Sequence, residues 1–188
     1  MMAQSMTARP KVGDHTFISE HAVIMGNVTI GDSVFIAPNA TIRCDEPGSE
    51  IVIGPGCNIQ DNVVIHSLAG CKVTIGSGTS IGHGSIVHGP CEIGERCFVG
   101  FGSVVFKSVL GDDAMVMHRA LVEDAIVPKR SLVPSGAMIK GTEGQSFIEI
   151  CSEMESFSNS VRSTNMQLAM AYNEKEGSRD NGTDDYKS

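Results

Sequence analysis

The chain of 188 residues contains no tryptophan, and only 5% of its residues are aromatic. This scarcity fits a core too narrow for large rings and filled by aliphatic side chains. Basic residues are also in the minority, with 14 Lys and Arg against 22 Asp and Glu and a formal net charge of −8. Because phosphate binding needs a basic face, this balance argues against nucleic acid as a partner.

Long apolar runs are absent as well. No stretch approaches the roughly 20 apolar residues of a transmembrane helix, so we expect no membrane insertion. The first residues lack the basic and apolar regions of a signal peptide, which favours a cytoplasmic protein. Cysteines with the close paired spacing of zinc ribbons are missing too. We therefore expect all six to be reduced thiols: Cys44, Cys57, Cys71, Cys91, Cys97 and Cys151.

The chain does contain an aliphatic residue at every sixth position over most of its length. These positions are Ile18, Ile24, Ile30, Ile36 and Ile42, then Ile53, Ile59 and Ile65, then Ile75, Ile81, Val87, Ile93, Val99 and Val105, and, after a slip of one residue, Leu110, Val116 and Val122. A period of six is neither helical nor a plain alternation, and it is typical of parallel β-helices. Glycine often follows the aliphatic residue, which indicates a corner with unusual backbone angles or a close approach.

The predicted fold is therefore an all-β solenoid, a parallel β-helix of hexapeptide repeats with a C-terminal α-helix. We expect a flexible N-terminus over 1–9, the β-helix over 10–140, a helical segment over 141–172 and a disordered tail over 173–188. The helical segment is indicated by apolar residues at helical spacing, namely Phe147, Ile150, Met154, Phe157 and Val161. The stretches 43–50 and 67–72 break the rhythm and are predicted to be loops that leave the coil.

Three histidines, His66, His83 and His88, interrupt the small residues of the repeat with nitrogen donors that suit zinc and similar divalent metals. His83 and His88 lie on consecutive hexads, which occupy different faces of a triangular coil, so their side chains should diverge. A shared ion then requires several coils side by side, as in a closed trimer. The remaining histidines, His15, His21 and His118, are interpreted as surface or corner residues.

The motifs around these histidines resemble the gamma-class carbonic anhydrases, and also the gamma-type N-terminal domain of the carboxysome assembly protein. The resemblance rests on 42–46 (Ile-Arg-Cys-Asp-Glu), 58–66 (Asn-Ile-Gln-Asp-Asn-Val-Val-Ile-His), 83–90 (His-Gly-Ser-Ile-Val-His-Gly-Pro), 97–107 and 133–139. It covers about residues 10 to 172. It implies a left-handed β-helix, a homotrimer and the reversible hydration of CO2 to bicarbonate.

The resemblance also implies a metal site built from His66 and His88 of one subunit and His83 of its neighbour. The metal would be Zn²⁺, although Fe²⁺ or Co²⁺ would fit the same ligands. Three residues match catalytic positions. Glu46 matches the active-site glutamate, Gln60 matches the glutamine that orients the reacting water, and Asn58 matches a pocket asparagine.

Four further residues match supporting positions of the family. Asn165 matches an asparagine that the C-terminal helix contributes to the pocket. Positions that hold the subunit interface together are matched by Arg43, Asp45 and Asp61. The residues alone leave open whether an ion pair between two subunits joins Arg43 to Asp61 or to Asp45.

The sequence departs from the family at one point. The archaeal prototype carries a long acidic loop with a proton-shuttle glutamate after its first ligand histidine, whereas His66 is followed by the short stretch 67–72. Proton export would fall to Glu46, solvent or buffer. Two alternatives stay open, a weak or inactive scaffold or assembly protein and a hexapeptide-repeat acyltransferase with a histidine as general base.

Overall fold

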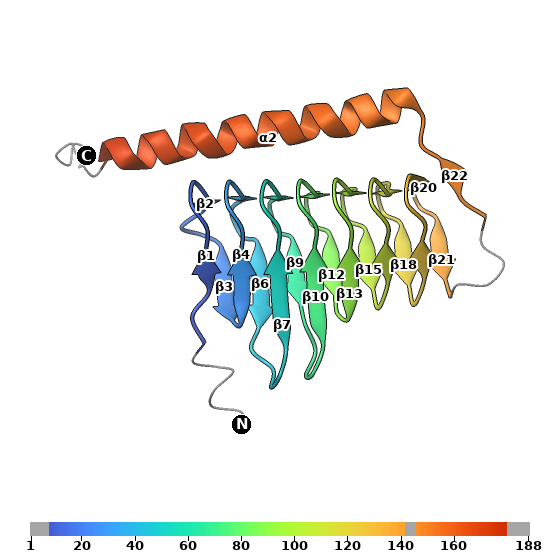
Figure 1. The fold of residues 1–188 in the computed structure, drawn as a ribbon, viewed down its shortest axis with the longest axis horizontal. Coiled ribbons are helices and arrows are strands. Elements are labelled where there is room, and N and C mark those ends of the chain that lie inside the picture. Colours follow the sequence, from blue (N-terminus) through green and yellow to red (C-terminus); the bar gives the residue numbers. More distant parts are fainter. Residues whose placement is uncertain (1–7, 142–145, 180–188) are drawn as a thin grey trace.

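The computed structural model describes residues 8–141 and 146–179. It confirms a left-handed parallel β-helix of about seven turns with one long helix along its side (Figure 1). Residues 1–7 of the predicted flexible N-terminus lie outside the described residues, as do 180–188 of the predicted tail.

Three parallel sheets form the faces of the β-helix, and successive strands of the chain fall on successive faces. Sheet A consists of β1 (Lys11–Val12), β4 (Val28–Ile30), β7 (Glu50–Ile53), β10 (Lys72–Ile75), β13 (Cys91–Ile93), β16 (Val109–Leu110) and β19 (Ile126–Val127). Sheet B consists of β2 (Phe17–Ile18), β5 (Phe35–Ile36), β8 (Asn58–Ile59), β11 (Ser80–Ile81), β14 (Phe98–Val99), β17 (Met115–Val116), β20 (Ser131–Val133) and the antiparallel β22 (Ile148–Glu149). Sheet C consists of β3 (Val23–Gly26), β6 (Thr41–Cys44), β9 (Val64–His66), β12 (Ile86–His88), β15 (Val104–Phe106), β18 (Leu121–Glu123) and β21 (Met138–Lys140).

The aliphatic residues of the repeat stack in register inside this triangle. In sheet B, for example, Ile36 lies on Ile59, which lies on Ile81, and all three are fully buried. Among the predicted sixfold positions, Ile18 and Ile24 of the first coil are only partly buried, because they have a neighbouring coil on one side. The predicted sixfold positions are thus confirmed as the core, which is stabilised by contacts between successive coils.

The glycines that follow these aliphatic residues serve close approach and not an unusual backbone angle. A Cβ on Gly76 would lie 2.5 Å from the carbonyl carbon of Gly94 in the next coil. The left-handed backbone comes two residues later, at Gly78 with a φ of 67° and at Arg96 with a φ of 54°. The sequence pattern predicted close approach or an unusual backbone angle at one and the same glycine. In the structure, close approach occurs at the glycine that follows the aliphatic residue, and the left-handed backbone occurs two residues later.

The helix α2 (Ser152–Arg179) differs in its limits from the predicted segment 141–172. It begins later because residues 148–149 form β22, which pairs with β20, and because the Ile150 amide bonds to the Arg130 carbonyl. It ends later, since residues 173–179 of the predicted disordered tail include Glu and Lys, which favour continuation of a formed helix. Within the described residues, no helix is long and apolar enough to cross a membrane.

Helix α2 packs on the outer face of sheet B of its own chain through two apolar clusters. One cluster joins Ala169 to Phe17 and Phe35 near the N-terminal coils. The other joins Ile150 and Met154 to sheet residues of later coils, Phe98, Met115 and Leu132. Between the clusters the buried outward residues of sheet B are polar, Asn58 and Ser80. These buried polar residues between the two apolar clusters lie at the first part of the candidate site.

The six cysteines are free, and burial separates them into reactivity classes. Burial raises the pKa of Cys57 and Cys97 to about 12, which keeps both thiols protonated at neutral pH. At pH 8 we expect Ellman's reagent to modify exposed Cys151 rapidly and Cys71 more slowly. Cys44, Cys57, Cys91 and Cys97 should react only after denaturation, because the thiolate is the nucleophile. Rapid modification of more than two thiols in the native protein would contradict this packing.

Candidate functional site

A column of polar side chains lies on sheet C where the predicted loops leave the coil. Arg43 of β6 is in register with His66 of β9, which is in register with His88 of β12. Because these residues end their strands at the same corner, the parallel register brings residues 23 and 22 positions apart into one group. The structure thus places His66 and His88 together, as expected.

The two rings lie close together in an edge-to-face arrangement. His66 Nδ1 lies 3.0 Å from His88 Nε2, and the ring centroids are 4.9 Å apart. The other nitrogen of His66, Nε2, lies 3.3 Å from Glu46 Oε1 and 3.3 Å from Arg43 Nη2. His66 is therefore surrounded by the residues that the family motif singles out.

The electrostatics of this group favour a neutral imidazole at His66. Burial lowers the pKa of His66, and the charges of Arg43 and His88 lower it further, while Glu46 and Asp45 oppose the shift. His88 Nδ1 is buried and has no hydrogen-bond partner among the described residues. Neutral rings with available nitrogen lone pairs are the form that binds a divalent metal.

The predicted loops 43–50 and 67–72 are found as shorter segments, 45–49 between β6 and β7 and 67–71 between β9 and β10, because residues 43, 44, 50 and 72 belong to strands. The two loops lie against each other. The Gly70 amide donates to the Pro47 carbonyl at 2.9 Å, and the Ala69 amide donates to Glu46 Oε2 at 2.7 Å. The second loop contains no acidic residue, so it offers no side chain in place of the family's acidic loop.

A second group of predicted residues lies on the opposite edge, where sheet B turns into sheet C. His83 Nδ1 lies 2.8 Å from Asp61 Oδ2 on the preceding coil. A carboxylate only accepts, so Nδ1 of His83 is the donor in this contact. Asp61 therefore orients His83 in its own chain, whereas Arg43 pairs with Asp45, with Nε 3.2 Å from Oδ1. Within one chain, Arg43 and Asp61 thus have different partners.

Three amides adjoin His83 beneath α2. Gln60 Nε2 donates to Asn58 Oδ1 at 2.5 Å and to Asn165 Oδ1 at 2.9 Å, and Asn165 Nδ2 donates to the Val161 carbonyl at 2.8 Å. Asn58 Nδ2 is buried without a hydrogen-bond partner among the described residues. The predicted contribution of Asn165 from the helix is thus seen as a direct contact with Gln60.

A cavity of about 290 Å³ opens between these amides, His83 and the helix. Its apolar walls are formed by residues that were not predicted as site residues from the sequence: Phe98, Phe101, Phe157 and Val161. Phe101 lies one coil from His83, with ring centroids 5.1 Å apart. A signal for Phe101 existed, because it stands between two glycines 18 positions after His83, in the same corner column.

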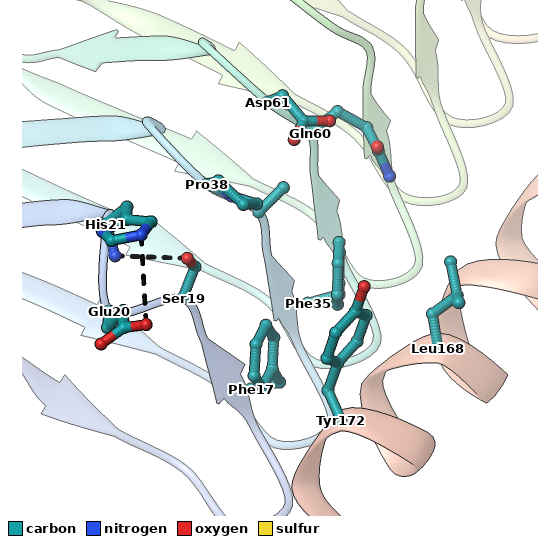
Figure 2. A pocket seen from close by; sticks show the side chains of 11 residues that line it. Phe17, Ser19, Glu20, His21, Phe35, Pro38, Gln60, Asp61, Leu168 and Tyr172 are labelled. Atoms are coloured by element: carbon teal, nitrogen blue, oxygen red, sulfur yellow. Dashed lines mark hydrogen bonds and ion pairs between the residues drawn. The ribbon is translucent and has the colours of Figure 1, made fainter. Parts of the chain in front are cut away.

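A larger cavity of about 390 Å³ lies toward the N-terminal coils and shares Gln60 with the first (Figure 2). One side is formed by the rings of Phe17, Phe35 and Tyr172, with Phe17 and Tyr172 stacked at 4.8 Å. Asp61 and His21 lie on the other side. Because Tyr172 belongs to α2, these rings also hold the C-terminal half of the helix against the first coils.

The two groups do not meet within one chain. No set of three or more His, Cys, Asp or Glu side chains in 8–141 and 146–179 is placed to hold a metal ion. Gln60 and His66 are close in sequence, but they occupy different faces because a corner separates β8 from β9. We call Arg43, Asp45, Glu46, His66 and His88 the sheet C half-site, and Asn58, Gln60, Asp61, His83 and Asn165 the corner half-site.

Comparison with known proteins agrees with the β-helix fold. Residues 9–44 and 72–107 match the family described as bacterial transferase hexapeptide (six repeats). A putative acetyltransferase of Bacillus cereus superposes with a TM-score of 0.78 at 24% identity, covering 88% of this chain and 92% of that one. At this identity the match supports the fold alone.

Two groups of curated relatives are similar over most of the chain. The carboxysome assembly protein of Nostoc is 35% identical over 88% of this chain, which spans only 32% of that protein and 20% of its Synechocystis counterpart. The carbonic anhydrase of Methanosarcina thermophila is 30% identical, with 88% of this chain and 75% of that enzyme covered. The chain therefore belongs to the hexapeptide-repeat family of the gamma-class carbonic anhydrases.

Proposed function

We propose that the protein catalyses the reversible, metal-dependent hydration of CO2 to bicarbonate at sites shared by adjacent subunits of a homotrimer. The single observation that carries the proposal is the division of the catalytic set into two complementary half-sites on one chain. Each half-site lacks what the other holds. A neighbouring copy that presents its corner to sheet C supplies the missing part.

Sheet C has a surface suited to such a neighbour. A register column of outward side chains runs along the whole sheet beside the histidines, formed by Val23, Thr41, Val64, Ile86, Val104, Leu121 and Met138. Several are exposed apolar residues, including Val64 at 37% and Met138 at 64%. Sheet B is covered by α2, so sheet C offers a continuous apolar strip for a second copy.

His66 and His88 would hold the metal together with His83 of the adjacent subunit. His66 Nδ1 and His88 Nε2 lie 3.0 Å apart, so both rings are close enough to contribute to one site. Zn²⁺ is the default, and Fe²⁺ or Co²⁺ fits the same ligands. When bound, the metal supplies Lewis acidity, which makes water a nucleophile near neutral pH.

The other residues of the half-sites would bind substrate and move protons. The apolar wall of Phe98, Phe101 and Phe157 accepts a non-polar gas molecule. Asn58 Nδ2, buried without a partner among the described residues, is a donor for a substrate oxygen. Gln60, whose amide group is held by Asn58 and Asn165, would orient the reacting water. Glu46 Oε1 would accept the proton that this water releases.

The test is stopped-flow CO2 hydration by anaerobically purified protein, with metal content measured in the same sample. We expect activity with one metal per subunit, loss of activity after chelation, and recovery with Zn²⁺ or Fe²⁺. Glu46→Gln should keep the metal and lower kcat by about a hundredfold. A metal-loaded trimer without a rate above buffer would defeat the proposal.

That last outcome would instead favour an assembly protein that retains the fold. The observations behind this second candidate are the identity to the carboxysome assembly proteins and the short loop after His66. A metal-free trimer that turns over acetyl-CoA would point to an acyltransferase.

A further inference from the structure

The loop Ser67–Cys71 has no acidic side chain but contacts the candidate proton acceptor with its backbone. Glu46 Oε2 accepts the Ala69 amide at 2.7 Å, while Oε1 lies 3.3 Å from His66 Nε2. One carboxylate oxygen is therefore held by the loop, and the other faces the histidine. A hydrogen bond to an ionised acceptor is among the stronger ones in proteins.

The backbone on both sides of this contact is fixed. On the glutamate side, Ser49 Oγ donates to the Glu46 carbonyl at 2.6 Å, and Ser49 is only 3% exposed. On the other side, the Cys71 amide donates to the Leu68 carbonyl at 3.0 Å and closes a turn with Ala69 at its second position. The Gly70 amide then ties this turn to Pro47. The amide of Ala69 is aimed at the carboxylate by the turn and does not depend on a mobile side chain.

We propose that the Ala69 backbone amide positions Glu46 for proton transfer, so that the short loop contributes a hydrogen-bond donor to the site. The inference rests on the proposed hydration of CO2. Ala69 touches neither substrate nor metal and acts through Glu46, as a positioning residue. With Oε2 held, the carboxylate keeps Oε1 3.3 Å from Nε2 of His66, one of the candidate metal ligands, and a misplaced acceptor transfers protons more slowly.

The turn allows a variant that removes only the donor. Gly70 has a φ of 66° and Ala69 is not among the residues of positive φ, which together define a type II turn from Leu68 to Cys71. Proline is favoured at the second position of this turn and has no N–H. The Ala69 side chain is exposed, so Ala69→Pro should keep the loop while deleting the bond. Ala69→Ser, which retains the amide, is the matched control.

The first measurement is CO2 hydration by both variants at low and at high imidazole concentration, with metal content and melting temperature recorded. For Ala69→Pro in dilute buffer we expect kcat to fall about tenfold, with kcat/KM, metal content and melting temperature unchanged. Concentrated imidazole should restore kcat, because a buffer can carry the proton instead. Ala69→Ser should match the wild type. Equal kcat for Ala69→Pro and wild type in dilute buffer, or a loss that imidazole does not restore, would overturn the inference.

A second measurement separates this inference from the proposed function. In wild-type protein we expect the Ala69 amide to be protected from hydrogen exchange, and in Glu46→Ala to lose at least about tenfold of that protection. Unchanged protection in Glu46→Ala overturns the positioning role whatever the activity. An inactive wild type that still shows the protection loss would sink the hydration proposal, and the proton-transfer role with it, while leaving the contact established.

Discussion

Mixing two inactive variants, His66→Ala and His83→Ala, should restore about a quarter of the wild-type CO2 hydration activity. Each variant alone should lose at least about a hundredfold, since even the outer partners of metal ligands are worth ten- to a hundredfold. In a mixed trimer one interface joins the intact sheet C half-site of the His83→Ala subunit to the intact corner of the His66→Ala subunit. Random mixing makes about three quarters of the trimers mixed, each with one working site of three.

The matched control mixes His66→Ala with His88→Ala. Both substitutions damage the sheet C half-site, so no arrangement of these subunits assembles a complete site, and activity should stay at the level of the single variants. Differently tagged subunits, refolded together and assayed by stopped flow with metal analysis, provide the measurement. Failure of the first pair to recover in demonstrably mixed trimers would refute the shared site. Recovery in the control pair would refute the assignment of His66 and His88 to one half-site.

Gly76→Ala should destabilise the protein by about 3 kcal/mol or more, as an overpacking substitution that rotamer changes cannot relieve. The added Cβ would lie 2.5 Å from the Gly94 carbonyl carbon, 2.6 Å from the Glu95 amide nitrogen and 2.7 Å from the Gly94 carbonyl oxygen. All three atoms belong to the backbone of the next coil, so the coils themselves must separate. Because each coil is stabilised by its neighbours, the damage extends to both.

Gly56→Ala is the matched control for this prediction. Gly56 has a φ of 66°, and a Cβ there would meet nothing within 4 Å. The expected loss in the free energy of unfolding comes from the left-handed backbone alone and is about 1 kcal/mol. Denaturant unfolding at one fixed protomer concentration compares the two, because the stability of an oligomer depends on concentration. A Gly56→Ala variant as unstable as Gly76→Ala would show that backbone angle, and not close approach, dominates at these corners.

The candidate site was predictable in its residues but not in its arrangement. The histidines His66, His83 and His88 stand out because they interrupt the hexad repeat. Glu46 and Gln60 were selected by the resemblance to the family, since Glu46 lies in the stretch 43–50 that breaks the rhythm. The contact of the Ala69 amide was not predictable. Every residue except proline has a backbone N–H donor, and the sequence does not indicate the direction of that N–H. The limits of α2 were also missed, because Phe147 and Ile150 fit a helical spacing but lie on either side of the strand β22.

The sequence by itself determined the β-helix, because a strict period of six leaves an aliphatic residue for each face and a corner between faces. It also determined which side chains could bind a metal or move a proton. Only the tertiary structure decided which of them meet. Coil-to-coil register brings His66 onto His88 across 22 residues, while one corner carries Gln60 away from His66 across six. Contacts of this kind depend on the register between stacked coils and on the places of the corners. Neither can be read from the separation of two residues along the chain.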